Sequence, residues 1–196
     1  MEPKTKLDVS EAEAARIRTA VRDVRTIEGV IGASRLVVPE DASAVLVLLK
    51  DERVSAAVYT LPRPFSIDSI TDWIEDHQRQ ARKGEGLLTL VEDASGQVVS
   101  ITDFRFWPEY SACEFGGVIA AHLQSKSYGT KGIRELCDWC FDIIGVRMLA
   151  MTSALDNVRS NKIFEGMGFT HMGEMDSVRP DGTVRRSNYW ELLKKY

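Results

Sequence analysis

A carboxylate beside two glycines is the first feature of this sequence that suggests catalysis. Glu114 begins the stretch of residues 114–120, which runs Glu-Phe-Gly-Gly-Val-Ile-Ala. A carboxylate among apolar groups takes a raised pKa, and it then accepts protons as a general base at a higher pH. Taken alone, a solvent-facing position at the start of a strand is the simpler interpretation of Glu114.

A second segment, residues 126–131, combines small residues with positive charge. It runs Lys-Ser-Tyr-Gly-Thr-Lys and lies between an expected strand and an expected helix. Free backbone N–H groups and the helix dipole at such a junction favour a phosphate. Lys126 and Lys131 add positive charge. One short glycine loop is also explained by a plain strand–helix connection with solvated lysines.

A third segment, residues 156–169, predicts a capped helix. Asp156 or Asn157 serves as the N-cap, Ser160 lies in the first turn, and Gly168 is a left-handed C-cap. The inward side chains are expected to be Ile163, Phe164 and Met167. Capping does not explain why this helix lies between two strands, shortly after the phosphate-like loop.

The elements around these segments follow from hydrophobic periodicity. Strands are predicted at residues 36–38, 87–91, 98–106, 114–120 and 148–152, and on both sides of the Asp181–Gly182 turn. Helices are predicted at residues 39–49 with Pro39 in the first turn, from Ser66 onward, at 129–145 and at 157–167. The paired glycines Gly116 and Gly117 indicate a bulge or the close approach of another backbone.

The N-terminal part of the chain predicts one more helix. Ser10 and Glu13 form an S-x-x-E capping box, and Gly29 ends the run. Its apolar residues recur at helical spacing, at Ile17, Val21, Val24 and Ile27. This amphipathic segment is interpreted as an extension, residues 1–28, that packs on a main domain of residues 29–196 or on a partner.

Composition excludes several classes of protein. With 196 residues, 44% hydrophobic and 28% charged, the chain fits one compact globular domain. A net charge of -4 argues against nucleic acid as a partner. The same charge attracts a cationic acceptor only weakly. No apolar run is long enough for a membrane span, and the charged first residues lack a signal-peptide core. A cytoplasmic location is therefore expected.

Cysteines, histidines and the last arginines give no further site. Cys113, Cys137 and Cys140 are expected to be reduced, and the C-x-x-C pair lies inside a predicted helix, where burial on one face is the expected role. The three histidines are scattered, so no metal site is predicted. The pair Arg185–Arg186 predicts a solvated face near the last turn.

The order of elements and one motif give the chain a resemblance to a known family. The motif is N-x-x-S-x-x-x-x-x-x-M-G-F, here Asn157, Ser160 and residues 167–169. Over residues 29–196 the chain resembles the GNAT superfamily, and within it the RimJ/RimL-like branch. The resemblance implies an α/β (α+β mixed) GNAT fold, with a central twisted mixed sheet of about six to seven strands, about four flanking helices and an extra N-terminal helix.

The resemblance also implies a cosubstrate and its site. Acetyl-CoA is the expected cosubstrate, with no metal. Its pyrophosphate is expected on Lys126, Ser127, Tyr128, Gly129, Thr130 and Lys131, and its pantetheine arm along Ile119, Ala120 and Ala121 and the Thr152 end of the next strand. Asn157 matches the position that bonds the arm. The family has a small residue where Lys131 stands, which implies a weakened or altered CoA site.

The resemblance assigns roles in acyl transfer as well. Glu114 matches a position often used as the base, acting through water. Many members carry a tyrosine where Phe164 stands, so Ser160 is the expected proton donor to the leaving thiolate. The acceptor is expected near the first two helices and the final hairpin, at aromatic residues that are equally well explained as core or rim: Tyr59, Phe65, Trp107 and Tyr110.

The predicted function is an acetyl-CoA-dependent N-acetyltransferase acting on a primary amine by direct attack. The acceptor is a protein N-terminus or a small-molecule amine such as a polyamine or an aminoglycoside. Two alternatives stay open: a non-catalytic acyl-CoA-binding module of the same fold, and a scaffold that uses the N-terminal helix as its interaction surface. The sequence leaves the oligomeric state open, a homodimer included.

Overall fold

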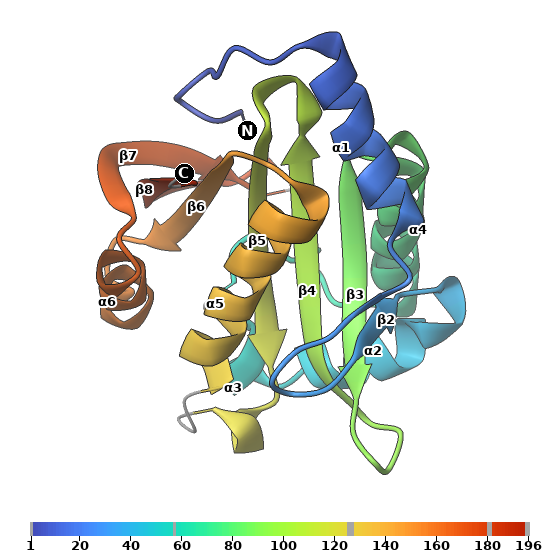
Figure 1. The fold of residues 1–196 in the computed structure, drawn as a ribbon. Helices are drawn as coiled ribbons and strands as arrows, with labels where there is room; N and C mark the ends of the chain where they lie inside the picture. Colours follow the sequence, from blue (N-terminus) through green and yellow to red (C-terminus); the bar gives the residue numbers. More distant parts are fainter. Residues whose placement is uncertain (1, 57, 125–127, 180–181, 195–196) are drawn as a thin grey trace.

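One eight-stranded sheet organises the molecule. A computed structural model describes residues 2–56, 58–124, 128–179 and 182–194. The strands follow the order β1-β2-β3-β4-β5-β6-β8-β7, and among the strands of these described ranges only β5 and β6 run parallel (Figure 1). Their bounds are β1 Thr26–Ile27, β2 Ser34–Leu36, β3 Gly86–Glu92, β4 Val98–Trp107, β5 Ala112–Ile119, β6 Met148–Ala154, β7 Thr170–Val178 and β8 Val184–Leu193. The predicted mixed sheet is confirmed.

The first edge of the sheet differs from the prediction. Thr26 and Ile27 pair with Arg35 and Ser34, so a short β1–β2 hairpin adds a strand to the expected six to seven. The strand expected at residues 36–38 ends at Leu36, although the Val37 N–H still donates to the Leu88 carbonyl at 3.0 Å. The N-terminal helix was expected to include Val24 and Ile27, but this helix, α1, spans Glu11–Asp23, and Ile27 pairs in β1. A two-residue strand carries too little periodicity to be recognised from sequence.

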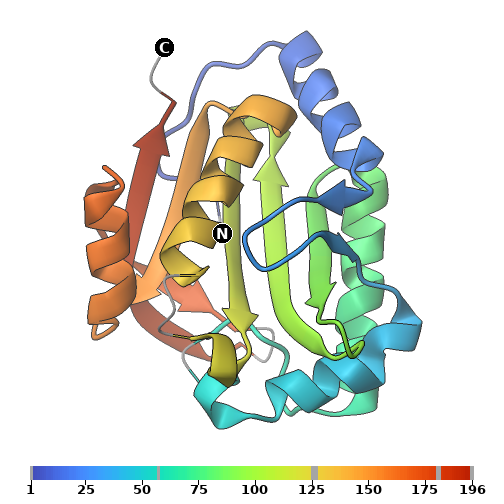
Figure 2. The same ribbon diagram turned by 60° about the horizontal axis from the view of Figure 1, so that its bottom comes forward.

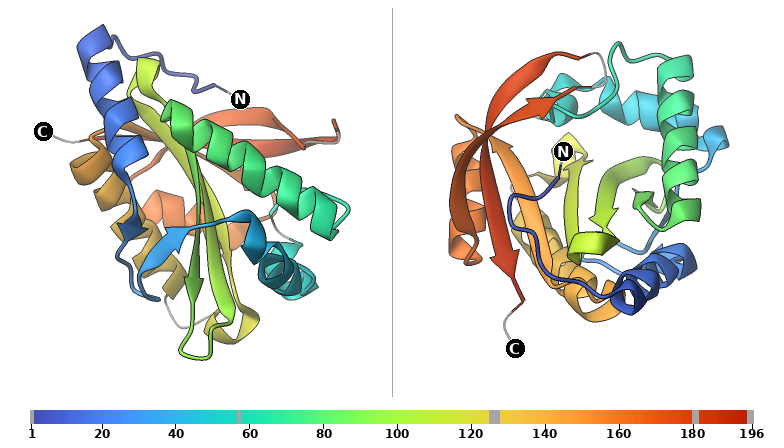
Figure 3. Two further views of the ribbon diagram at one scale, coloured as in Figure 1. Left: turned by 90° about the vertical axis from the view of Figure 1, so that its right-hand side faces the viewer. Right: turned by 90° about the horizontal axis from the view of Figure 1, so that it is seen from above.

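Helices cover both faces of the sheet (Figure 3). The helical elements are α1 Glu11–Asp23, α2 Ala42–Leu49, α3 Glu52–Ser55, α4 Ile67–Lys83, α5 Tyr128–Trp139 with a π-helical end at Cys140–Ile144, and α6 Val158–Gly166. Short 3₁₀ turns lie at Pro39–Asp41, Pro108–Tyr110 and Ala121–Leu123. No helix in the described ranges is long and apolar enough to cross a bilayer.

Alternation along the strands divides the core into two layers. Phe104, Cys113 and Leu149 pack with α1, α5 and α6, and we call this side of the sheet the α5 face. Ile101 and Val118 pack with α2 and α4, and we call that side the α4 face. The register pairs Ile101 with Val118 and Phe104 with Phe115, which keeps the two sets apart. Each functional side chain can therefore be placed on a face by its position along a strand.

Helix α1 packs on the α5 face. Its Ile17 and Val21 are fully buried in the same core as Phe104. The Ser10 hydroxyl accepts a hydrogen bond from the Glu13 N–H at 3.2 Å, as a capping box requires. The Glu13 carboxylate instead lies 2.9 Å from Arg147 Nε. The Ser10 half of the predicted capping box is therefore present, whereas the Glu13 side chain forms an ion pair with Arg147, just before β6.

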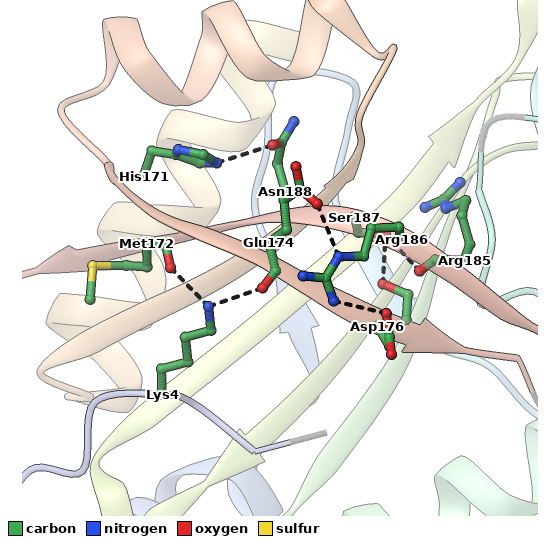
Figure 4. Close-up of polar contacts among 10 residues, drawn as sticks. Lys4, His171, Met172, Glu174, Asp176, Arg185, Arg186, Ser187 and Asn188 are labelled. Atoms are coloured by element: carbon green, nitrogen blue, oxygen red, sulfur yellow. Dashed lines mark hydrogen bonds and ion pairs between the residues drawn. The ribbon is translucent and has the colours of Figure 1, made fainter.

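The residues before α1 connect to the last two strands. Thr5 donates to Glu191 from its N–H at 2.9 Å and from its hydroxyl at 2.5 Å. Lys4 Nζ donates to the carbonyls of Met172 and Glu174, at 2.8 and 3.2 Å, where β7 has an irregular register (Figure 4). The N-terminal segment therefore contributes donors to a buried carboxylate and to two strand carbonyls.

Other predictions about single residues are confirmed. A Cβ on Gly117 would collide with the Ile101 carbonyl, so this glycine allows the predicted close approach of another backbone. Gly168 has φ +85° after α6, as a left-handed C-cap does. The three cysteines are buried and free. Burial raises the pKa of Cys137 to about 12, so its thiol is unreactive at neutral pH.

Candidate active site

The parallel strands β5 and β6 pair only at one end. Ala112 pairs with Met148 and Cys113 pairs with Leu149. Beyond these residues β5 runs on to Ile119 and β6 to Ala154, and the two strands diverge (Figure 2). Backbone groups that face the gap are not used in the β5–β6 ladder, so they are available to bond a ligand.

A cavity of about 1060 Å³ passes through this gap. Its lining on the α5 side includes Ile119, Tyr128 and Gly129, together with Asn157 and Ser160 from the start of α6. Its lining toward the α4 face includes Tyr59, His77, Asp103, Trp107 and Arg185. Residues on both faces line one cavity, so two molecules can meet inside it from opposite sides of the sheet.

Glu114 lies where the strands part. It directly follows Cys113, the last residue of β5 paired with β6. Across the gap the Thr152 hydroxyl donates a hydrogen bond to Glu114 Oε1 at 2.9 Å. Burial raises the pKa of Glu114, the Thr152 hydrogen bond opposes this, and the negative charge of Asp103 raises the pKa further. The carboxylate is therefore a stronger proton acceptor than an exposed one.

The buried His77 pairs with the half-buried Asp103 on the same side of the sheet. His77 Nε2 is 2.8 Å from Asp103 Oδ1, and its Nδ1 is 2.9 Å from the Trp73 carbonyl. Carboxylates and carbonyls only accept hydrogen bonds, so both ring nitrogens are best satisfied when they carry protons. Burial alone would lower the pKa of His77, but the Asp103 and Trp73 oxygens outweigh it and raise the pKa.

The N-terminus of α5 and the guanidinium of Arg159 lie close together at the cavity. Tyr128 and Gly129 line the cavity there. Arg159, from the first turn of α6, also lines the cavity, and its Nη2 lies 3.8 Å from the point that a Cβ on Gly129 would occupy. A helix N-terminus with a guanidinium beside it suits a phosphate.

The expected pyrophosphate segment is only partly described by the structure. Lys126 and Ser127 lie outside the described residues. Thr130 and Lys131 are exposed and are not among the cavity-lining residues of the described chain. The structure thus brings Tyr128 and Gly129 to the cavity and leaves the bulky Lys131 outside it.

Asn157 is the N-cap of α6. Its Oδ1 accepts a hydrogen bond from the Ser160 N–H at 3.1 Å, which decides between the two residues predicted as the cap. The cap uses only this oxygen, so the Asn157 Nδ2 is a donor that can bond a ligand. Ser160 and Asn157 line the cavity together.

Known proteins can now be compared with this chain. Residues 35–170 match the family model described as an acetyltransferase (GNAT) domain. The chain belongs to the GNAT acetyltransferase family. It is an enzyme of the class that transfers acetyl groups, and its homologues are named ribosomal-protein N-acetyltransferases, which supports the RimJ/RimL-like branch.

Three relatives of this GNAT chain illustrate the likeness. A Bacillus subtilis protein, provisionally named ribosomal N-acetyltransferase YdaF, is 25% identical over 82% of this chain and 90% of its own length. An N-acetyltransferase structure from Staphylococcus aureus has a TM-score of 0.61 at 25% identity, covering 83% of this chain and 98% of its own. Mycobacterium smegmatis RimJ in complex with CoA-disulfide has a TM-score of 0.67 at 16% identity, covering 86% and 84%.

Of the residues expected along the pantetheine arm of this GNAT domain, one lines the cavity and two pack in or against the core. Ile119 lines the cavity. Ala120 is buried in the core beneath α2 and α4, and Ala121 packs against that core. The side chains of these two alanines therefore serve packing, while the unpaired end of β5 lies at the cavity.

The four expected acceptor residues are also divided. Tyr59 and Trp107 line the cavity. Phe65 packs against the α2–α4 core with the Arg63 guanidinium 4.5 Å from its ring centre. Tyr110 packs against Trp107 and its neighbours, with Lys6 Nζ 3.7 Å from its ring centre. Two of the aromatic side chains are thus at the site and two belong to its surroundings.

Some site residues of the GNAT domain were missed by sequence reasoning. Asp103 and Arg159 line the cavity, but neither was assigned a role from the sequence, whereas Thr152, which also lines it, was expected beside the pantetheine arm. The signal for Asp103 is strand alternation, because it stands two residues after the buried Ile101 and so shares its face. Arg159 follows Asn157 by two residues, but its direction depends on how α6 packs beside α5.

Proposed function

We propose that this acetyltransferase moves the acetyl group of acetyl-CoA to a primary amine by direct attack. The acceptor amine is a protein N-terminus or belongs to a small molecule. The observation that carries the proposal is the cavity that passes between β5 and β6 with Glu114 at the crossing. A thioester entering from one face and an amine entering from the other would meet beside this carboxylate.

The α5 side of the cavity suits the cosubstrate. The diphosphate would lie at the N-terminus of α5, near Gly129 and Arg159. The pantetheine amides would bond the unpaired backbone of β5, with Asn157 Nδ2 within the same cavity. Two comparisons support this placement. GNAT acetyltransferases use acetyl-CoA, and a relative of the same fold was solved with CoA-disulfide.

The proposed chemistry conserves charge and atoms at each step. Glu114 takes a proton from the acceptor ammonium, directly or through one water, and the neutral nitrogen attacks the thioester carbonyl carbon. The C–S bond breaks as the amide C–N bond forms. Ser160 donates its hydroxyl proton to the departing thiolate, and the second proton of the attacking nitrogen returns through water to the Ser160 oxygen. Glu114 then releases its proton to solvent. The raised pKa of Glu114 makes it a better acceptor in the first step.

A second candidate is an acyl-CoA-binding module without turnover. The observation in its favour is Phe164, which lies where many family members carry a tyrosine and is buried against Phe169 and Trp190. In that case CoA would raise the melting temperature, and turnover would be the same for the native chain and a Glu114→Gln/Ser160→Ala double variant.

The decisive experiment incubates the full chain with labelled acetyl-CoA and a panel of amines that includes peptides, polyamines and aminoglycosides. We expect label to appear on at least one acceptor and to be lost in the Glu114→Gln variant. A thermal shift with CoA shows that the native chain and the variant are folded and bind the cosubstrate. Folded, CoA-binding protein that labels none of these amines would contradict the proposal.

A further inference from the structure

Two neighbouring arginines on β8 point in opposite directions. Arg186 is exposed and pairs with Glu174 and Asp176 at 2.9 and 3.1 Å, and Figure 4 shows Arg185 directed away from that group. Arg185 is half-buried and lines the cavity. The predicted solvated face is therefore correct for Arg186 and wrong for Arg185, because alternation along a strand sends adjacent side chains to opposite faces.

Arg185 belongs to a cluster on the α4 side of the cavity. Its Cζ lies 4.5 Å from the ring centre of Tyr59, and the Cζ of Arg179 lies 4.1 Å from the same point. Arg179 Nε also donates to the Tyr59 carbonyl at 3.1 Å. All three residues line the cavity. We call Tyr59, Arg179 and Arg185 the arginine–tyrosine cluster.

The cluster has excess positive charge. Burial lowers the pKa of Arg185, and the like charge of Arg179 lowers it further, while Tyr59 and Asp156 act in the opposite direction. Within the described chain, the buried Arg185 Nε has no hydrogen-bond acceptor. A guanidinium in this state is best satisfied by an anionic oxygen, and a carboxylate matches its planar donors.

The register of the sheet gives the distance from the cluster to Glu114. Tyr189 and Arg185 stand four residues apart on the same face of β8, which is about 13 Å along the strand. Tyr189 pairs with Thr152, whose hydroxyl bonds Glu114. An extended peptide covers such a distance with about four residues. A polyamine would bring more positive charge to the cluster and would be repelled.

We propose that the arginine–tyrosine cluster binds a carboxylate of the acceptor. The preferred acceptor is then a protein N-terminus with Asp or Glu within about the first four residues. This inference rests on the proposed function, because it takes the amine at Glu114 as the other end of the acceptor. The same two arginines would also suit a phosphate of the cosubstrate, so the experiment separates the two ligands.

The experiment uses pairs of N-terminal peptides that differ only by Glu against Gln at positions two to four. Native enzyme is expected to prefer the acidic peptide by about tenfold or more in kcat/KM, since charge-assisted bidentate bonds are the stronger ones. Arg185→Ala abolishes that preference with unchanged KM for acetyl-CoA, and Arg185→Lys restores part of it. Arg186→Ala, the matched control on the other face, keeps the preference.

Three results would overturn the inference. Equal kcat/KM for both peptides in the native enzyme is one, and an Arg186→Ala variant that loses as much preference as Arg185→Ala is another. The third is a rise in KM for acetyl-CoA in Arg185→Ala with the peptide preference intact, which would assign the cluster to a phosphate. If no peptide is acetylated, calorimetric binding of the same pairs still decides the inference while the proposed function fails.

Discussion

At the scale of single residues, Glu114 and Thr152 control the proposed proton transfer. Burial raises the pKa of Glu114 above its ordinary value of 4.5, and the Thr152 hydroxyl opposes that rise. The active form is the carboxylate, so kcat/KM increases with pH through this raised pKa and then levels off. Replacing Glu114 by Gln is expected to lower kcat by about 10²–10⁴-fold.

Thr152 provides a sharper test of the same site. Thr152→Val removes the donor that stabilises the carboxylate, so the pKa of Glu114 rises further and the acid limb of the pH–rate profile moves to higher pH. Thr152→Ser keeps a hydroxyl and leaves the limb in place. An acid limb that stays at the native pH in Thr152→Val would show that Glu114 is not the group that titrates.

His77 links protonation to stability at the residue scale. Its folded-state pKa is raised above 6.5, so its bond to Asp103 contributes stability that is fully present below pH 6.5 and is lost as pH rises through the raised pKa. The difference in unfolding free energy between native protein and His77→Gln should therefore shrink as the pH increases, measured by denaturant titration. A difference that does not change with pH would contradict this.

At the scale of elements, the starts of α5 and α6 are expected to act together on the diphosphate. Arg159 reaches from α6 to Gly129 at the start of α5, whereas Lys131 is exposed outside the cavity. Arg159→Ala should raise the KM for acetyl-CoA by about tenfold, and Lys131→Ala should change it little. Steady-state kinetics with varied acetyl-CoA measure both. A rise in KM for Lys131→Ala that exceeds the rise for Arg159→Ala would place the diphosphate on the lysine side.

Local signals predicted most elements because capping and periodicity act within a few residues. Ser66 caps α4 as expected, with its hydroxyl accepting from the Ser69 N–H at 3.1 Å. The helix predicted at residues 39–49 is a 3₁₀ turn at Pro39–Asp41 followed by α2. The sequence predicts the end of an element less accurately where a second interaction decides it. In β2, pairing with β3 at Leu36 competes with the 3₁₀ turn at Pro39.

At the scale of the whole molecule, the N-terminal segment stabilises the far edge of the sheet. Glu191 is 6% exposed, and its carboxylate accepts hydrogen bonds from Thr5 and from the Tyr189 hydroxyl at 2.7 Å. Thr5→Val removes the hydroxyl that donates to Glu191 Oε2, which lowers the free energy of unfolding by about 1–3 kcal/mol. We expect the melting temperature to fall by about 2–4 °C per kcal/mol.

Lys6→Ala is the matched control for Thr5→Val. Lys6 lies one residue away and is exposed, and its contacts with Glu2 and the Tyr110 ring are at the surface, so its replacement should change the melting temperature less than Thr5→Val does. Differential scanning calorimetry of both variants gives the comparison. Similar melting temperatures for the two variants would mean that the N-terminal segment does not stabilise Glu191.

The position of α1 bears on how the chain is divided into domains. Its Ile17 is fully buried in the core that also holds Phe104. The boundary after residue 28 stays a prediction. A single cooperative unfolding transition, shifted as a whole by Ile17→Ala, would mean that the extension and the domain unfold together.

The sequence by itself determined most helices, most strands and the family motif, because caps, turns and periodicity are local, but it did not predict α3 or the end of α1 at Asp23. It also determined that Glu114 lies in a strand, although β5 begins at Ala112, and that Asn157 or its neighbour caps α6. The tertiary structure decided that β5 and β6 part after Cys113, and which side chains then line the gap. Strand pairing joins residues far apart in the chain, so no local pattern reports that separation.

The same reason explains the acceptor side. The net charge of -4 pointed weakly to a cationic acceptor, whereas Arg179 and Arg185 bring local positive charge to the cavity. Adjacent residues of β8 have opposite environments because one faces the cavity and the other faces solvent, beside Glu174. The sequence supplies both arginines, and the fold decides which of them meets a ligand.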